Sequence, residues 1–409
     1  MLSESPLRRH IMAHMYSYAR VSRWVLFTCV TVLSLLGVVM LYSTTARSGE
    51  GMLKKQLMWI AVGLVGAFVA YLIDYRKLCK HRRILILGAA VPLLYLAAAH
   101  GLYQFDIGNV PGVPEINGAH RWLRFGGFSL QPSEFAKLAV IIFTAGFYGS
   151  NPRFSQSIRK WILPMSGIAV VGLLILSGGS LSVTGITATV VTGMLFVAGV
   201  RLRWFGVLAG IAVVGVACVL WLSPSRMNRV TKYRHPELYQ QNETYQLWRS
   251  QLAIGSGHFT GAGFNGSRMK ESYLPEAHTD FIMAIVGEEL GFVTIASVLL
   301  LYVLLTLAAF CIAMAAPDAQ GTLLGFGIGL MFWLGAYINL GVVCGILPTT
   351  GISAPFVSYG GSGLLGSWIA IGILLNIASN SHVSEEEEEL DQSPARGAGR
   401  STVTGRMLA

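Results

Sequence analysis

Long apolar runs separated by short polar segments follow one another from residue 24 to residue 380. A helix of about 20 apolar residues is long enough to cross the hydrocarbon core of a membrane. The pattern therefore predicts an all-α, polytopic membrane protein with about ten transmembrane helices. These helices are expected over residues 24–42, 56–73, 84–102, 133–148, 161–178, 184–200, 204–222, 291–315, 321–340 and 363–378.

Composition agrees with this interpretation. Of the 409 residues, 53% are hydrophobic and 12% are charged, and the mean hydropathy is +0.58. Soluble domains carry roughly 25% charged residues, so a soluble globular fold is excluded. The first apolar run is too long for a signal-peptide core and follows a hydrophilic segment, so we expect it to be retained as the first span.

Orientation can be predicted from the short loops, because Lys and Arg accumulate in cytoplasmic loops. These residues are dense before the first predicted span, between the second and third, after the fourth and after the sixth, and sparser in the alternate loops. Both termini should therefore be cytoplasmic, and the long loop 223–279 should face outward. The net charge of +10 then reflects topology and anionic lipid rather than binding of nucleic acid.

The chain divides into one membrane domain and two tails. Residues 1–23 form a basic cytoplasmic segment, residues 24–380 the membrane domain, and residues 381–409 a tail that carries the acidic run Glu385–Glu389. The tail composition cannot bury a core, so we expect it to be disordered. The acidic run is either a solvated flank or a docking site for a partner protein.

Three segments on the predicted outer side are rich in Gly, Pro or polar residues: 103–132, 223–279 and 341–362. Broken backbone is tolerated at membrane depth only where protein buries it or water reaches it, and long structureless loops are uncommon unless they are functional. We therefore expect the three segments to converge on one extracytoplasmic cavity. The five cysteines are scattered without metal-binding spacing, which indicates neither a disulfide framework nor a metal site.

Glu134 and Lys137 form the first candidate group, in the segment that contains Gln131, Pro132 and Ser133. Pro132 suits the first turn of a helix, and residues three apart lie on one helical face. The two charges are either a structural ion pair or part of a polar site for a charged substrate, in which Lys137 would meet phosphate oxygens.

Asp280 is the second candidate, at the end of the long loop and next to His278 and Thr279. It could cap the following helix, or it could act as a general base that takes a proton from a hydroxyl. Glu288 and Glu289, further along the same run, are expected to anchor the helix start or to pair with a loop Arg.

Two further stretches could contact a substrate. Residues 245–257 can form a short interfacial helix that contains Gln246 and ends at Ser256 and Gly257. The Gly-Ser-Gly end is either a flexible turn or a set of backbone N–H groups that bind an anion. Arg121 lies beside Trp122 on the outer side. Its guanidinium suits bidentate recognition of a diphosphate, and Trp122 suits interfacial anchoring.

At these residues the sequence resembles the SEDS family, the polytopic glycosyltransferases that polymerise peptidoglycan in division (FtsW), elongation (RodA) and sporulation (SpoVE). The resemblance runs from about residue 24 to residue 378. The motifs that carry it are Asp74-Tyr75-Arg76, Gly118-Ala119-His120-Arg121-Trp122, Gln131-Pro132-Ser133-Glu134 with Lys137, Ala253-Ile254-Gly255-Ser256-Gly257, Leu274-Pro275-Glu276-Ala277-His278-Thr279-Asp280-Phe281, Glu288-Glu289-Leu290-Gly291, Leu347-Pro348-Thr349-Thr350-Gly351 and Ser358-Tyr359-Gly360-Gly361-Ser362.

The resemblance implies a ten-span enzyme that uses lipid II at the outer face of the bacterial cytoplasmic membrane. The family's essential carboxylate matches Asp280, and the residues that match Glu134 and Lys137 line its central cavity. Asp280 would deprotonate the 4-hydroxyl that attacks the anomeric carbon, undecaprenyl diphosphate would leave with inversion, and Lys137 and Arg121 would stabilise that diphosphate. The remaining candidates for substrate contact are Trp122, Gln131, Ser133, Gln246, Ser256, His278 and Thr279.

The resemblance also implies partners. These are a single-span class B penicillin-binding protein that cross-links the strands and the other proteins of the division machinery. No cofactor is required by the motifs, although a divalent cation (Mg²⁺ or Mn²⁺) would be compatible with a diphosphate leaving group. Ala277 and the stretch Ile338-Asn339-Leu340 favour the division branch over the elongation branch, and hence a location at the septum.

The chain departs from the family pattern at two places, and two alternative functions stay open. Most members carry Gln/Glu-Pro-Asp-x-Gly where this chain has Leu181-Ser182-Val183-Thr184-Gly185, and His258 replaces a glycine. Any role of the missing aspartate cannot be carried over. A lipid II flippase would share the intramembrane charges and broken helices, although its polar groups should reach both sides of the membrane. A non-enzymatic scaffold would tolerate loss of Asp280.

Overall fold

The computed structural model describes residues 6–45, 51–104, 110–116, 119–126, 128–150, 158–239, 244–271 and 274–392, with the backbone alone for 6–18, 125, 158–163 and 382–392. Gly118 of the sequence motif therefore lies outside the described residues. The predicted disorder beyond residue 392 also stays a prediction.

A long helix occupies each of the ten predicted apolar runs, which confirms the all-α polytopic fold. These helices are α1 (Pro6–Thr45), α2 (Gly51–Leu72), α4 (Arg82–Gln104), α5 (Pro132–Ser150), α6 (Ile158–Ser177), α7 (Leu181–Val197), α8 (Arg203–Trp221), α11 (Ile282–Met314), α12 (Ala319–Val343) and α13 (Gly361–Gln392). Among the described residues, seven of them are long and apolar enough to cross a membrane by length and composition, namely α1, α2, α4, α8, α11, α12 and α13. The apolar parts of α6 and α7 are shorter, and α5 carries a charged pair in its first turns.

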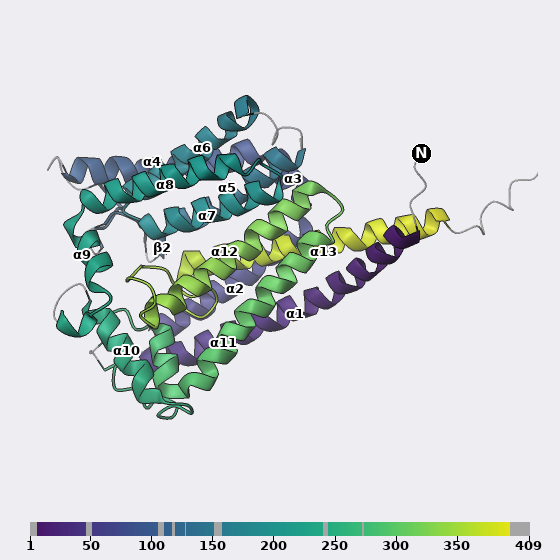
Figure 1. Cartoon of the computed structure of the whole chain (residues 1–409). Coiled ribbons are helices and arrows are strands. Elements are labelled where there is room, and N and C mark those ends of the chain that lie inside the picture. Colours follow the sequence, from purple (N-terminus) through teal and green to yellow (C-terminus); the bar gives the residue numbers. More distant parts are fainter. Residues whose placement is uncertain are drawn as a thin grey trace, which may run out of the picture.

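Short elements connect the long helices. The connections contain α3 (Tyr75–Lys80), the antiparallel strands β1 (Leu123–Phe125) and β2 (Phe128–Leu130), α9 (Pro224–Lys232), the 3₁₀ helix η2 (Pro236–Leu238) and α10 (Tyr245–Gly257). Elements β2, α9 and α10 gather at one end of the molecule, and α3 lies at the other end (Figure 1). We call these the pocket end and the opposite end.

The centre of the bundle is built from α5, α11, α12 and α13. Helix α12 packs against α5, α7 and α11, while α13 packs against α2 and α1 packs against α11. Small residues let α12 approach its neighbours closely. At Gly327, for example, an added Cβ would lie 2.9 Å from Ile141 and 2.7 Å from the Met194 sulfur.

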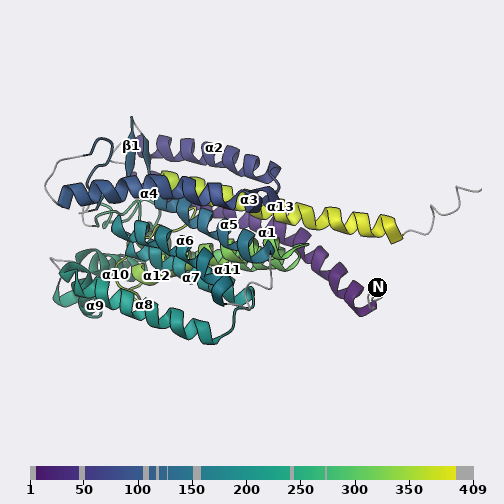
Figure 2. The same cartoon turned by 90° about the horizontal axis from the view of Figure 1, so that it is seen from above.

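Three helices depart from a compact bundle. No residue of α8 is buried, and this helix lies apart from the others along most of its length (Figure 2). Helices α1 and α13 extend past the other helices at the opposite end (Figure 1). Helix α13 continues to Gln392, through the acidic run, where the sequence predicted a disordered tail from residue 381.

Helix α11 is kinked at Gly291, whose φ of 77° is accessible mainly to glycine. The kink frees backbone groups that the preceding loop then uses. The N–H groups of Ala262 and Gly263 donate to the carbonyls of Glu288 and Glu289 at 2.8 and 3.0 Å, and the N–H of Phe292 donates to the carbonyl of His258 at 2.9 Å. The loop is thereby fixed to the helix that follows Asp280.

Glu288 and Glu289 hold the same loop through their side chains. Glu288 accepts hydrogen bonds from the Ser267 hydroxyl (2.5 Å) and the Arg268 N–H (2.9 Å). Glu289 is fully buried and forms an ion pair with Lys270 at 2.8 Å. The predicted anchoring role is confirmed, with the cation supplied by a lysine rather than an arginine.

Candidate active site

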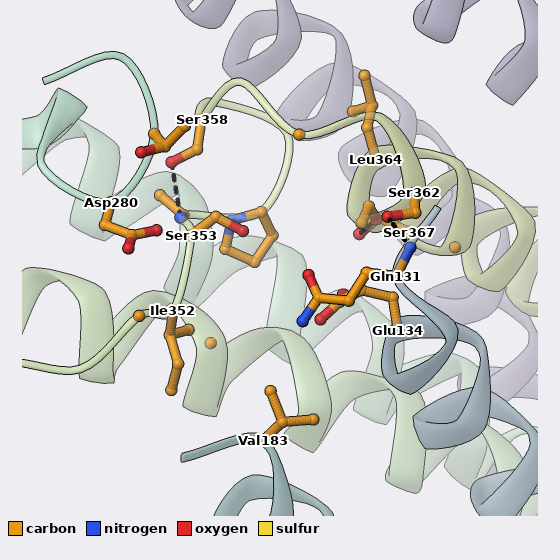
Figure 3. A pocket seen from close by; sticks show the side chains of 18 of the residues that line it. Gln131, Glu134, Val183, Asp280, Ile352, Ser353, Ser358, Ser362, Leu364 and Ser367 are labelled. Carbon is orange, nitrogen blue, oxygen red and sulfur yellow. Dashed lines mark hydrogen bonds between the residues drawn. The ribbon is translucent and has the colours of Figure 1, made fainter. Parts of the chain in front are cut away.

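A cavity of about 210 Å³ opens at the pocket end between α5, α7, α12 and α13. Its wall includes residues from all three segments that the sequence placed on the outer side, among them Arg121, Thr279 and Gly351. The predicted convergence of the three segments is therefore confirmed. Figure 3 shows Asp280 on one side of the cavity, Glu134 with Gln131 on the other, and Val183 on a third side.

Asp280 lies at the end of the long loop, just before α11 begins at Ile282. Glu276 starts the local turn and adopts a positive φ of 56°; its carbonyl accepts hydrogen bonds from the N–H groups of Thr279 and Phe281 at 3.1 and 3.3 Å. Asp280 does not cap α11, because Phe281 occupies the N-cap position, with no side-chain capping bond. The carboxylate is instead part of the cavity wall.

The surroundings of Asp280 favour its protonated form. The pKa of Asp280 is raised to about 7, chiefly by burial and also by the negative charge of Glu276, while the Arg121 guanidinium opposes the increase. A carboxyl group with a pKa near neutrality is suited to accept a proton during a reaction and to release it afterwards.

Arg121 lies across a narrow gap from Asp280. A Cβ added at Gly351 would lie 3.5 Å from Asp280 Oδ2 and 3.7 Å from Arg121 Nη1, so the backbone of Gly351 borders the gap. Arg121 Nε is buried and has no hydrogen-bond partner among the described residues. Burial lowers the pKa of Arg121, as do Arg226 and Arg229 of α9, and Asp280 opposes the decrease. The cavity therefore has a cationic side.

Gly351→Ala should reduce activity without unfolding the protein. The added methyl group would make only ordinary van der Waals contacts, so we expect the free energy of unfolding to change by less than about 1 kcal/mol. The methyl would nevertheless enter the gap between Asp280 and Arg121, and we expect kcat/KM to fall roughly 10-fold. Gly88→Ala in α4 is the control, because a Cβ there meets nothing within 4 Å and Gly88 is not part of the cavity wall. Equal activities of the two variants would contradict this view of the gap.

Glu134 and Lys137 project from the first turns of α5, as the helix start at Pro132 predicts. Lys137 Nζ lies 2.9 Å from Glu134 Oε2, and both side chains are largely buried in the cavity wall. The N–H of Gln131 donates to the Ser362 hydroxyl at 3.1 Å, and Gln131 Nε2 donates to the Ser133 hydroxyl at 3.1 Å. Helices α5 and α13 are thereby joined where they border the cavity.

Seven of the eleven candidate residues line the cavity: Arg121, Trp122, Gln131, Glu134, Lys137, Thr279 and Asp280. The other four do not. Ser133 is buried behind Gln131, and the carbonyl of His278 accepts a hydrogen bond from the Tyr359 N–H at 3.0 Å. Gln246 and Ser256 lie on α10, outside the cavity wall.

The Gly-Ser-Gly end of α10 serves helix packing. A Cβ at Gly257 would collide with the carbonyl oxygen of Gly287 in α11, and the Ser256 hydroxyl donates to the carbonyl of Ala253 at 2.8 Å. The three residues are therefore helical, with Gly257 closely packed, and they do not form the open turn that would present N–H groups to an anion.

Other residues of the site were not singled out from the sequence. Glu276, Gly351 and Ile352 line the cavity, and the buried Asn339 of α12 contacts the backbone of Asp280. The proximity of Glu276 to Asp280 in the chain was an available signal. Val183, at the position where the resemblance predicts an aspartate, also lines the cavity.

The donor set does not match a resident metal ion. Among the residues that the structure describes, no group of three or more His, Cys, Asp and Glu side chains could hold one. Of the three carboxylates in the cavity wall, Glu134 lies on the side opposite Asp280 (Figure 3) and is already paired with Lys137. Glu276 and Asp280 remain as one pair, which is fewer than three ligands.

Comparison with known proteins agrees with the fold and the cavity. The family model described as "Cell cycle protein", for FtsW, RodA and SpoVE, matches residues 23–383. The probable peptidoglycan glycosyltransferase FtsW of Trichlorobacter lovleyi is 37% identical over 87% of this chain and 92% of the relative. The stage V sporulation protein E of Bacillus subtilis is 35% identical over 86% of this chain and 96% of the relative.

Solved structures show the same architecture. A peptidoglycan synthase complex that coordinates polymerization and crosslinking contains a chain with a TM-score of 0.71 and 26% identity, covering 88% of this chain and 98% of that one. The rod shape determining protein RodA of Thermus thermophilus gives a TM-score of 0.64 at 25% identity, over 88% of this chain and 97% of that one.

Proposed function

This chain belongs to the FtsW/RodA/SpoVE family of cell cycle proteins, and we propose that it polymerises lipid II into peptidoglycan strands at the outer face of the bacterial cytoplasmic membrane. The observation that carries this proposal is the buried Asp280 carboxyl group, with a pKa of about 7, facing Arg121 across the cavity. The relatives named as probable peptidoglycan glycosyltransferases support the same reaction class.

Asp280 would act as the general base. It takes the proton from the 4-hydroxyl of the GlcNAc of an incoming lipid II while that oxygen forms a bond to the anomeric carbon of the strand's terminal MurNAc. The bond from that carbon to the diphosphate oxygen breaks on the opposite face. Undecaprenyl diphosphate leaves with the electron pair, and the configuration inverts. A general base contributes about 10²–10⁴-fold to the rate, so stabilisation of the leaving group must supply much of the remainder.

Arg121 is the better candidate than Lys137 for that stabilisation. Lys137 is neutralised by Glu134 at 2.9 Å, whereas Arg121 keeps its Nε without a hydrogen-bond partner among the described residues. Arg226 and Arg229 add positive potential from α9. A guanidinium can bind two phosphate oxygens at once. Lys137 would then orient Glu134 and the sugar rather than bind the diphosphate.

Polymerisation by the purified protein tests this proposal. Fluorescent lipid II in detergent would be incubated with the protein, and the products separated on a gel, with and without the cognate class B penicillin-binding protein carrying an inactive transpeptidase. We expect a ladder of glycan strands that the partner increases. Absence of polymer under both conditions would contradict the proposal, because a scaffold or a flippase makes none.

The pH dependence should follow the titration of Asp280. Its pKa is raised from 3.8 to about 7, so the base is protonated and inactive below neutrality. We expect kcat/KM to increase about 10-fold per pH unit up to pH 7 and to level off above it. A profile that is flat between pH 5.5 and 8 would exclude Asp280 as the base.

We further propose a role in cell division with a class B penicillin-binding protein and other division proteins as partners. The relatives named FtsW support the division role, and the synthase complex with the same fold supports a cross-linking partner. A fluorescent fusion should concentrate at the septum. Uniform labelling of the side wall would indicate the elongation role instead.

A further inference from the structure

Asn339 is a buried polar residue inside α12, with 1% of its surface exposed. Its Nδ2 group donates two hydrogen bonds, one to the backbone carbonyl of Asp280 at 2.8 Å and one to the backbone carbonyl of Ile352 at 2.7 Å. Both acceptors belong to non-helical segments that border the cavity. One amide group therefore joins the end of the long loop to the broken segment between α12 and α13.

The two carbonyls depend on this donor. A buried carbonyl that loses its hydrogen bond is destabilised because water no longer solvates it. Removal of the Asn339 amide would therefore favour movement of both segments toward water. Ile352 directly follows Gly351, and Gly351 borders the gap between the Asp280 carboxylate and the Arg121 guanidinium. The same amide thus fixes the backbone that carries the carboxylate and the backbone that separates it from the cation.

We propose that Asn339 is a positioning residue that holds the Asp280 backbone and the Gly351–Ile352 segment at a fixed separation, and so keeps the reacting carboxylate shielded from water and directed across the gap. This inference rests on the proposed function of Asp280. Asn339 acts through the backbone and not on the substrate. The charged groups that face the cavity with Asp280 are Glu276, Arg121 and the Glu134–Lys137 pair.

Asn376 provides a matched control. It is also a buried asparagine in a long helix, with 7% of its surface exposed, and it also makes two hydrogen bonds to backbone. Its Oδ1 accepts from the Tyr75 N–H at 2.9 Å, and its Nδ2 donates to the Tyr71 carbonyl at 2.7 Å. These contacts lie between α2, α3 and α13 at the opposite end. Asn376→Ala should therefore cost comparable stability without reaching Asp280.

A measurement of thermal stability against pH tests the inference without substrate. Because the folded-state pKa of Asp280 is raised, the stabilisation from its bound proton is complete below pH 3.8 and is lost as the pH rises through 7. At pH values above 7, Asp280→Asn should therefore have a higher thermal unfolding midpoint than wild type. Near pH 4 the two midpoints should be equal. We call this increase in midpoint above pH 7 the alkaline gain. When Asp280→Asn is combined with Asn339→Ala, we expect the alkaline gain to fall by at least half, because water then reaches the carboxylate. When it is combined with Asn376→Ala, the alkaline gain should stay intact.

Polymerisation kinetics provide the second readout. For Asn339→Ala we expect kcat to fall about 10–100-fold with KM within roughly 3-fold, and the rise of activity with pH to begin at lower pH. Asn339→Asp keeps the side-chain volume and replaces both N–H donors with a carboxyl group that can donate at most one O–H, so it should show a loss of the same kind that is at least as large. Asn376→Ala should match wild type in kcat per folded molecule.

Three results would overturn the inference. One is an alkaline gain from Asp280→Asn that survives in both Asn339 variants, and another is equal kcat in Asn339→Ala and Asn376→Ala. The third is failure of both Asn339 variants to fold while Asn376→Ala folds, which would show a role in folding alone. If wild type makes no polymer, the proposed function fails, and the stability titration still decides whether Asn339 positions Asp280.

Discussion

Asp280→Asn is expected to lower polymerisation of lipid II by about 10²–10⁴-fold while the protein stays folded. The substitution keeps the shape of a side chain in the cavity wall and removes its capacity to take a proton. Because the carboxylate is the form that burial disfavours, loss of activity should come with unchanged or higher thermal stability above pH 7. The measurement is initial polymerisation rate with purified protein, alongside the unfolding midpoint of the same sample.

Asp318→Asn is the matched control for this experiment. Asp318 is the N-cap of α12 at the opposite end, where it accepts hydrogen bonds from Arg76 Nε (2.7 Å), the Tyr75 hydroxyl (2.8 Å) and the Gly321 N–H (2.8 Å). Loss of the Asp318 carboxylate should weaken the contacts between α3 and α12. The polymerisation rate per folded molecule should stay near that of wild type. An Asp280→Asn protein that polymerises at near wild-type rate would remove the general base from the mechanism.

Lys270→Met is expected to cause the largest loss of stability. Lys270 is 8% exposed, and its partner Glu289 is fully buried, with Nζ and Oε1 at 2.8 Å. Glu289 also accepts hydrogen bonds from the Ser43 hydroxyl at 2.7 Å and the Asn265 N–H at 3.0 Å. Removing the cation leaves a buried carboxylate uncompensated, which typically costs about 3–5 kcal/mol. The unfolding midpoint in detergent should fall by several degrees.

The loss of stability in Lys270→Met is expected because the ion pair is buried, and two comparison variants test this explanation. Lys55→Met removes an exposed lysine and should change the midpoint little. Adding Glu289→Gln to Lys270→Met removes the stranded charge and should recover part of the loss. Protease cleavage within residues 258–271 should increase in the single variant and decrease again in the double variant. A single variant as stable as wild type would show that the pair is dispensable.

The positions of the ten long helices could be predicted from the sequence because each apolar run is long and bounded by polar residues. The Glu134–Lys137 pair was also predictable, since residues three apart share a helical face, and so was the convergence of three broken segments on one cavity. Each of these depends on local pattern. The predicted sides of the membrane and the predicted disorder after residue 392 stay predictions.

Contacts between distant segments were not predictable in the same way. Asn339 lies in an otherwise apolar run, and its acceptors are 59 and 13 residues away, so nothing near it in the sequence indicates its partners. The position of Gln246 and Ser256 outside the cavity wall was not predictable, because a Gly-Ser-Gly sequence looks the same whether it forms an anion-binding turn or allows α10 to contact Gly287. Lys270 was overlooked as the partner of Glu289 because the loop fold that joins them has no periodic signature.

The kink at Gly291 sets the depth in the bilayer at which we expect the proposed reaction to take place. Helix α11 has 33 residues and is about 50 Å long, whereas the hydrocarbon core is about 30 Å thick. The part of α11 from Phe292 to Met314 measures about 35 Å and spans that core by itself. We therefore expect the part before the kink, which is fixed to the loop, to lie at the level of the lipid head groups. Asp280 precedes it, so a lipid-linked diphosphate could react at its natural depth while its hydrocarbon chain stays in the bilayer.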